Sequence, residues 1–121
     1  MNATAGFLLT ALALLLVDIP WLTLIGGPYG DVVQKIQGGK PMVARPLAGL
    51  PVYLAMAYLV QKASSIQEAF LLGATTYAVY DFTNYALFSN YDWKFMLMDS
   101  LWGGILFALT YRLMKSYGLV E

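Results

Sequence analysis

Three aspartates lie inside long apolar segments of the chain, where an ionisable side chain is unusual. They are Asp18, Asp81 and Asp99. A carboxyl group at membrane depth is costly, and such residues are as a rule paired with polar groups, bind an ion or a ligand, or carry protons. We therefore expect the chemistry of this protein to begin at these three residues.

The residues that follow two of these aspartates repeat. Asp18 precedes Trp21 by three positions, and Asp99 precedes Trp102 by three positions. In a helix this spacing places the carboxyl group and the indole on the same face. The sequence therefore predicts two helices that each present an acid together with a tryptophan, and all four residues are candidates for a binding site.

The third aspartate has polar neighbours at helical spacing. Tyr77 lies four residues before Asp81, and Asn84 lies three residues after it, so the three side chains share one face of a helix. Asparagine and tyrosine side chains can hydrogen-bond a carboxylate or share a bound cation with it. Asp99 can approach this face from an antiparallel helix, which makes Asp81 the best candidate for the key residue of a binding site.

The composition is that of an integral membrane protein. Of the 121 residues, 60% are hydrophobic and only 12% are charged, whereas a soluble domain carries about 25% charged residues. The chain has no cysteine and no histidine, which excludes disulfides, thiolate catalysis and the usual zinc, copper and haem sites. Because the formal net charge is zero and no basic tract occurs, we expect contact with membrane lipid and not with nucleic acid. We expect neither a metal nor a cofactor.

Four apolar segments have lengths near the ~20 residues that a helix needs to cross a bilayer. They cover about residues 5–25, 46–60, 66–88 and 93–114. The chain is too short for a second domain of ordinary size. The sequence therefore predicts one all-α domain, an integral membrane four-helix bundle that crosses the bilayer several times.

Local signals indicate where these helices begin and end. Gly26-Gly27-Pro28 is expected to end the first helix. The stretch 26–45 is then a loop, in which residues 32–36 form at most one turn of interfacial helix. Ser65 and Glu68 have the spacing of a capping box at the start of the third helix.

Counting residues from the predicted helix ends places the three aspartates at one depth. Asp18 and Asp81 each lie seven residues before the end of a helix, which is about 10 Å at 1.5 Å per residue. Asp99 lies six residues, or ~9 Å, after the start of an antiparallel helix. We expect their carboxyl groups to cluster, with Arg45 at the start of the second helix close enough to pair with one. Three ionised acids facing one cation would repel, so at least one should be protonated or hold a bound cation.

Two segments of the sequence resemble the motifs of a known family. The run Tyr80-Asp81-Phe82-Thr83-Asn84 and the run from Asp99 to Gly103 are similar to those of small predicted membrane proteins called domain of unknown function 2177. The resemblance extends over nearly the whole chain and implies four spans. It marks as motif residues Asp18, Trp21, Tyr80, Asp81, Thr83, Asn84, Asp99, Trp102 and Gly103. The family has no established activity, but some bacterial members are encoded near fatty-acid-modifying enzymes, which implies a link with lipid metabolism.

Three classes of function remain open from the sequence. The first is a transporter-like protein whose acids bind a proton, a cation or a small cationic solute, and a water-filled opening to the acids would favour it. The second is an enzyme or an accessory protein of membrane lipid modification, which a lateral cleft open to lipid would favour. An aspartate could then act as general base, but no nucleophile is evident, so an enzyme is the less favoured interpretation. The third is a non-catalytic subunit or a homo-oligomer, in which the acids form a sealed polar knot that fixes the helix register.

Overall fold

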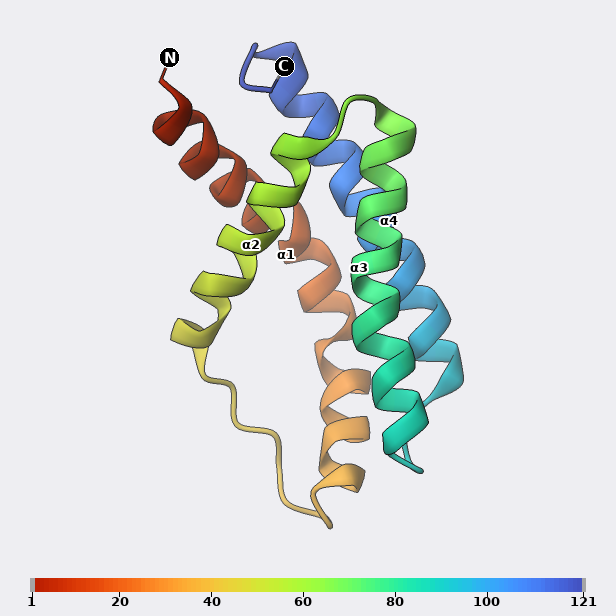
Figure 1. Ribbon diagram of the computed structural model, residues 1–121. Helices are drawn as coiled ribbons and strands as arrows, with labels where there is room; N and C mark the ends of the chain where they lie inside the picture. The colour runs from red at the N-terminus through yellow and green to blue at the C-terminus, as the bar shows by residue number, and fades with distance from the viewer. Residues whose placement is uncertain (1, 121) are drawn as a thin grey trace.

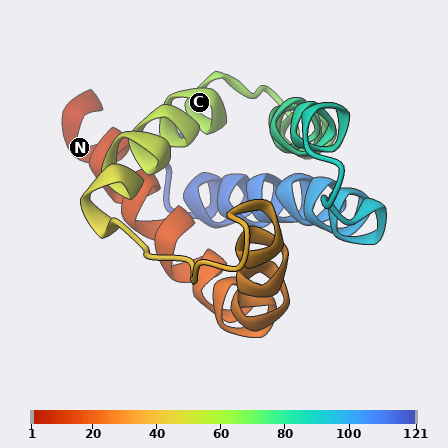
Figure 2. The same ribbon diagram turned by 90° about the horizontal axis from the view of Figure 1, so that it is seen from below.

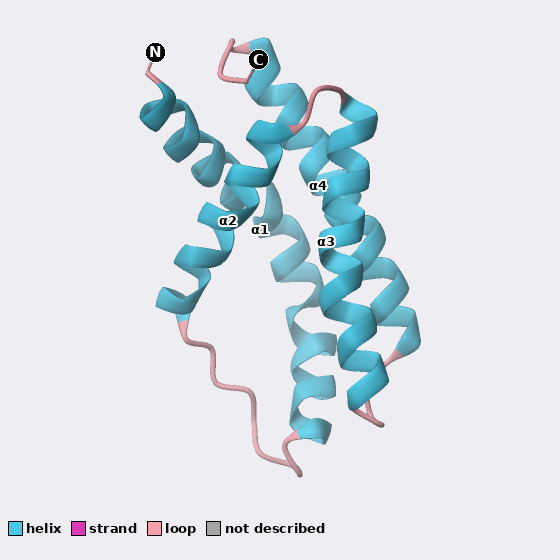
Figure 3. Cartoon of the chain, in the orientation of Figure 1, coloured by secondary structure: helices cyan, strands magenta, loops and turns pink. Residues whose placement is uncertain are grey.

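Four helices make up the part of the chain that the structure describes, residues 2–120. In this computed structural model α1 spans Ala3–Ile36, α2 Gly49–Lys62, α3 Ile66–Leu87 and α4 Trp93–Ser116, and a 3-10 turn, η1 (Pro46–Ala48), precedes α2 (Figure 1). No strand occurs within residues 2–120 (Figure 3). The predicted all-α four-helix bundle is therefore confirmed.

The helices are arranged as two pairs. α3 lies along α4, α2 crosses α1 and packs on it, and α1 also contacts α4 (Figures 1 and 2). α2 and α3 leave their short connecting turn at the end of the molecule where the described chain begins and ends, and they diverge from there (Figure 1). Toward the other end α2 therefore separates from α3, whereas the last part of α1 stays beside α3 and α4.

Glycines permit the close contact between α3 and α4. A methyl group on Gly73 would collide with the carbonyl oxygen of Gly103 and would lie 2.6 Å from the ring of Phe107. Small residues at a helix interface allow two backbones to approach in this way. The close contact holds α3 and α4 as a pair and brings Asp81 beside Asp99.

The prediction that the first helix ends at Gly26-Gly27-Pro28 is wrong. α1 continues through these residues to Ile36 and is 34 residues long. Glycine and proline weaken a helix locally, but the last part of α1 buries Val32 against the start of α4. The residues in this apolar contact are Val32, Tyr91, Phe95 and Met96. Tertiary packing therefore outweighs the local signal for a helix end.

The loop after α1 is shorter than predicted and covers residues 37–45. Gly38 and Gly39 have φ angles of 68° and 95°, and this left-handed conformation favours glycine. The helix therefore stops at these two glycines and not at the earlier pair. The turn of helix expected around residues 32–36 is the last part of α1.

The other helix boundaries agree with the prediction to within three residues, the largest difference being the start of α2, which η1 precedes. At the start of α3 the Ser65 hydroxyl accepts a hydrogen bond from the backbone N–H of Glu68 at 3.0 Å. The Glu68 carboxylate accepts one in turn from the backbone N–H of Ser64 at 3.2 Å. The first bond satisfies a donor that the first turn of a helix otherwise leaves unpaired, and the second ties Glu68 back to the residue before the cap, so the predicted capping by Ser65 is present.

Apolar side chains cover much of the outside of the bundle, and three aspartates lie inside it. Leu16, Leu71 and Leu101 are more than half exposed on three different helices, whereas the buried polar side chains include the three aspartates. This distribution suits an environment of lipid. Among the described helices, only α1 is both long enough and apolar enough to qualify as a membrane span by length and composition.

Candidate functional site

The three aspartates meet inside the bundle from three helices. Asp18 comes from α1, Asp81 from α3 and Asp99 from α4, and their side chains are 3%, 0% and 7% exposed. We call these three residues the carboxyl layer. Helix counting had placed them at one depth, and the α1–α4 and α3–α4 contacts bring them together.

Two of the aspartates take part in a reciprocal pair of hydrogen bonds between α1 and α4. The indole N–H of Trp102 donates to Asp18 Oδ1 at 2.7 Å, and the indole N–H of Trp21 donates to Asp99 Oδ1 at 3.0 Å. The two indoles stack with ring centroids 5.4 Å apart and an interplanar angle of 15°. We call this arrangement the Asp–Trp clasp.

The clasp follows from the repeated spacing and the direction of the helices. Each motif places its acid one turn before its indole, and α1 and α4 run in opposite directions (Figure 1). The acid of one helix therefore lies opposite the indole of the other. Each carboxyl group is bonded by the tryptophan of the partner helix, not by the tryptophan of its own motif.

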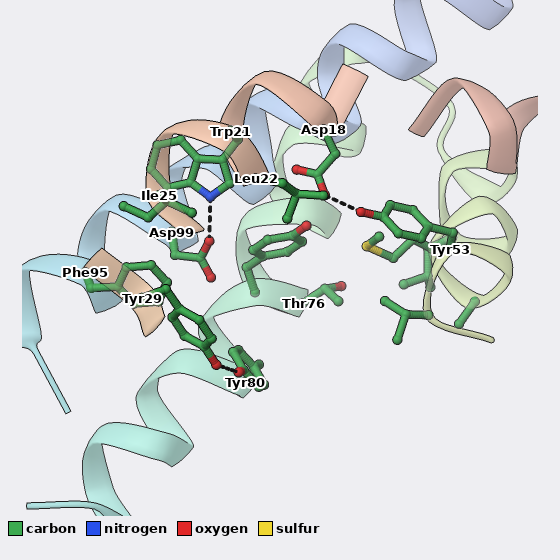
Figure 4. A pocket seen from close by; sticks show the side chains of 15 residues that line it. Asp18, Trp21, Leu22, Ile25, Tyr29, Tyr53, Thr76, Tyr80, Phe95 and Asp99 are labelled. Carbon is green, nitrogen blue, oxygen red and sulfur yellow. Dashed lines mark hydrogen bonds between the residues drawn. The ribbon is translucent and has the colours of Figure 1, made fainter. Parts of the chain in front are cut away.

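Tyrosines supply the other donors to the carboxyl layer. The Tyr53 hydroxyl of α2 donates to Asp18 Oδ2 at 2.5 Å (Figure 4). The Tyr91 hydroxyl, from the α3–α4 turn, donates to Asp81 Oδ1 at 2.6 Å. Burial, and then this bond to Asp81, raise the pKa of the Tyr91 phenol, so Tyr91 remains a hydrogen-bond donor. All of these donors are neutral groups.

Sequence reasoning missed both tyrosines. Tyr53 lies seven residues after Pro46, the predicted start of its helix, which is about 10 Å at 1.5 Å per residue. The same depth count that located the aspartates would have located Tyr53. Tyr91 lies between the predicted third and fourth helices, and its sequence neighbours give no signal of its contact with Asp81.

Asp81 and Asp99 lie side by side. Their carboxyl groups are within hydrogen-bonding reach of each other. Asp81 Oδ2 is buried and has no hydrogen-bond donor among the described residues. Most buried polar atoms have a partner, so a buried carboxyl oxygen without a donor is unusual.

The prediction that Arg45 pairs with one of the aspartates is wrong. Arg45 is exposed in the loop before η1, and the hydrogen-bond donors to the carboxyl layer are tryptophans and tyrosines. α2 begins on the side of α1 away from α3 (Figure 2), which puts Arg45 outside the bundle. There the guanidinium avoids the cost of desolvation.

A cavity of about 570 Å³ lies between the two helix pairs, beside the carboxyl layer. Its lining is mainly apolar and aromatic, with carboxyl groups from Asp18 and Asp99 (Figure 4). Asp81 is not part of the lining and lies behind Asp99. The lining residues are Asp18, Trp21, Leu22, Ile25, Tyr29, Val52, Tyr53, Ala55, Met56, Leu59, Thr76, Tyr77, Tyr80, Phe95 and Asp99.

Two tyrosines join α1 and α3 along the wall of this cavity. The hydroxyl groups of Tyr29 and Tyr80 are hydrogen-bonded to each other (Figure 4). The Tyr29 ring also packs on Phe95 with centroids 4.9 Å apart. Tyr29 reaches this position only because α1 continues beyond Pro28, so the corrected length of α1 contributes directly to the site.

The predicted site residues thus separate into three groups. Trp21, Tyr77 and Tyr80 line the cavity together with two of the aspartates. Trp102 holds Asp18 from within the clasp. The remaining candidates lie outside the cavity lining: Asp81 is buried beside Asp99, Thr83 and Arg45 are exposed, and Asn84 is half-buried.

The clasp predicts a specific stability difference among the three tryptophans of the chain. Replacing Trp21 or Trp102 by phenylalanine keeps an aromatic ring but removes the donor to a buried carboxyl group. We expect each change to lower the free energy of unfolding by about 1.5–3 kcal/mol, measured by reversible unfolding in detergent micelles. The control is Trp93→Phe, because the Trp93 side chain is 53% exposed. An equal loss of stability in all three variants would contradict the clasp.

Comparison with known proteins identifies a family. The sequence profile of the family described as predicted membrane protein (DUF2177) matches residues 3–114. No curated protein matches the chain, and no solved structure matches it. The match includes the clasp, the carboxyl layer and every residue that lines the cavity. The chain belongs to this family of predicted membrane proteins.

Proposed function

We propose that this protein is a multi-pass membrane protein that binds a lipophilic organic cation in the cavity beside Asp18 and Asp99. One observation carries the proposal. A layer of buried carboxyl groups, bonded by neutral donors, borders a cavity that is mainly apolar and aromatic. A proton-coupled or cation-binding transporter is the class of protein that needs such a site.

The charges of the site favour a cationic ligand. Within residues 2–120, Asp18 and Asp99 receive hydrogen bonds from Trp102, Tyr53 and Trp21, which bring no positive charge. A buried carboxylate without a counter-charge is costly. A cation in the cavity supplies that charge at a distance where the low dielectric makes the attraction strong.

The walls of the cavity favour a cation with apolar substituents. Trp21, Tyr53 and Tyr77 present aromatic rings along the lining, and such rings attract organic cations through cation–π interactions. A hydrated inorganic ion would find few polar ligands on these walls. The volume of about 570 Å³ falls within the range of roughly 300–1,000 Å³ typical of small-molecule sites.

The helix arrangement supports entry of the ligand from the bilayer. The cavity is lined from one side by α2 and from the other by α3, and these helices diverge from their connecting turn (Figure 1). A lipophilic cation concentrates in the membrane, so a lateral opening between α2 and α3 would receive it directly. Such a route would combine the acid site of a transporter with the lateral opening expected of a lipid-handling protein.

Several features support four membrane spans. α3 has 22 residues and α4 has 24, close to the ~20 that a span requires. The span formed by η1 and α2 is the shortest, because η1 has 3 residues and α2 has 14. Four lysines lie at or near helix ends, where long basic side chains reach the headgroups. They are Lys35, Lys62, Lys94 and Lys115.

A cysteine-accessibility map tests the four-span topology. The chain contains no cysteine, so single-cysteine variants need no altered background. We expect Lys40→Cys and Ser89→Cys to react with a membrane-impermeant maleimide from one side of the membrane. Ser64→Cys and Ser116→Cys should react from the other side, because α2 and α4 end there (Figure 1). Labelling of all four positions from the same side would contradict the topology.

Calorimetry with a matched pair of ligands tests the site. We expect the protein in lipid nanodiscs to bind methyltriphenylphosphonium saturably, above the background of empty nanodiscs. The nearly isosteric neutral compound triphenylphosphine oxide should bind at least about tenfold more weakly, a difference of ~1.4 kcal/mol. Asp18→Asn should weaken binding of the cation by a similar factor, since the amide keeps the shape of the side chain and removes its charge.

Asp31→Asn is the matched control for this experiment. Asp31 is a second acid of α1 that is exposed and lies outside the cavity lining, so this variant should bind like the wild type. The proposal would fail if the cation and the neutral compound bound equally well. It would also fail if Asp18→Asn, with unchanged helical circular dichroism, kept the wild-type affinity.

A further inference from the structure

The proposed cation site has a second carboxyl group behind it that the cavity does not contact. Asp81 is 0% exposed and is absent from the cavity lining. One of its oxygens, Oδ1, accepts the hydrogen bond from Tyr91. The other, Oδ2, is buried without a donor, and the polar group beside the Asp81 carboxyl is the carboxyl group of Asp99.

Asp99 lies between Asp81 and the cavity. Its Oδ1 accepts the indole N–H of Trp21, and its side chain lines the cavity. The same carboxyl group is therefore within reach of Asp81 on one side and of a bound ligand on the other. Whatever binds in the cavity beside Asp99 acts on the Asp81–Asp99 pair.

No cationic side chain faces this pair within residues 2–120. The titratable groups around it are Asp18 and Tyr29 of α1, Tyr77 and Tyr80 of α3, and Tyr91 of the α3–α4 turn. α2 contributes Tyr53, which is bonded to Asp18. Each of these groups is an acid or a phenol, so none supplies a positive charge.

Two carboxyl groups in contact, without a cation, are accommodated when they share a proton. The O–H of one then donates to an oxygen of the other, as in sites where paired carboxylates cannot both ionise. A shared proton gives Asp81 Oδ2 the partner that it otherwise lacks. It also removes one of the buried negative charges.

We propose that Asp81 and Asp99 hold one shared proton in the ligand-free protein and release it when a cation binds beside Asp99. This inference rests on the proposed cation site and adds that the site exchanges a proton for the cation. The O–H bond of the pair breaks, the proton passes to the surrounding water, and the cation takes its place as counter-charge. One proton leaves for each monovalent cation bound, so the total charge of the carboxyl layer together with its bound cation does not change.

Calorimetry in buffers of different ionisation enthalpy counts the protons that leave on binding. Methyltriphenylphosphonium is the appropriate probe because it is permanently charged and has no ionisable proton of its own. We expect the wild-type protein to release about one proton per cation bound at neutral pH, and its affinity to fall as the pH is lowered. Saturable binding with no proton release would overturn the exchange while leaving the cation site intact.

Asp81→Asn identifies the source of the proton. With an amide at this position Asp99 has no second carboxyl group with which to share a proton, and the amide N–H can donate to Asp99 instead. We expect this variant to bind the probe without releasing a proton and with an affinity independent of pH. Asp31→Asn should release as many protons as the wild type. Full proton release from Asp81→Asn would overturn the assignment to this pair.

A second variant decides the assignment if Asp81→Asn does not fold. Tyr91→Phe leaves both carboxyl groups in place and removes the donor to the ionised form of Asp81. Proton release should therefore persist, with its pH midpoint moved to higher pH. An unchanged midpoint would exclude Asp81 as the source. Absence of any saturable binding by the wild type would instead count against the cation site itself, so the two failures are distinguishable.

Discussion

Buried carboxyl groups need hydrogen-bond donors or counter-charges, and the arrangement of this bundle depends on how that need is met. Asp18 and Asp99 are held by indole N–H groups of the opposite helix at 2.7 and 3.0 Å. Because each bond joins one helix to the other, the pair fixes how far α1 and α4 slide and how they face each other. The donors are neutral, however, so the bonds satisfy the oxygen atoms without supplying a positive charge.

The same packing that gives the aspartates their hydrogen-bond donors also leaves the cavity beside them. Gly73 and Gly103 let α3 and α4 approach closely, which leaves no room between these two helices. α2 packs on α1 and diverges from α3 (Figure 1), so the free volume collects between the pairs. Asp18 and Asp99 face that volume, whereas Asp81 lies behind it. The carboxyl layer is thus divided. A ligand in the cavity can reach Asp18 and Asp99, whereas Asp81 is in reach of the Asp99 carboxyl group and not of the ligand.

Much of this arrangement follows from the sequence. Hydropathy and length predicted the four helices, and counting along them placed Asp81 and Asp99 at one depth, because the rise of a helix is constant. The count for Asp18 used a helix end near Ile25, whereas α1 ends at Ile36. The continuation of α1 to Ile36 was not predictable, since it depends on Val32 packing against residues more than fifty positions away. For the same reason the position of Arg45 was wrong. Its place in the sequence gives its depth but not the side of the bundle on which it lies.

The hydrogen-bond partners of the aspartates were likewise only partly predictable from the sequence. The repeated spacing of Asp18 with Trp21 and of Asp99 with Trp102 indicated a shared function for four residues. Only the antiparallel contact of α1 and α4 shows that the bonds cross between the motifs.

The central claim is that a proton neutralises the interior of the ligand-free site. Infrared spectroscopy of the protein in lipid at neutral pH tests it most directly. The account predicts a carbonyl-stretch band of a protonated carboxylic acid that disappears in Asp81→Asn, and spectra showing only ionised carboxylates in the wild type would contradict it.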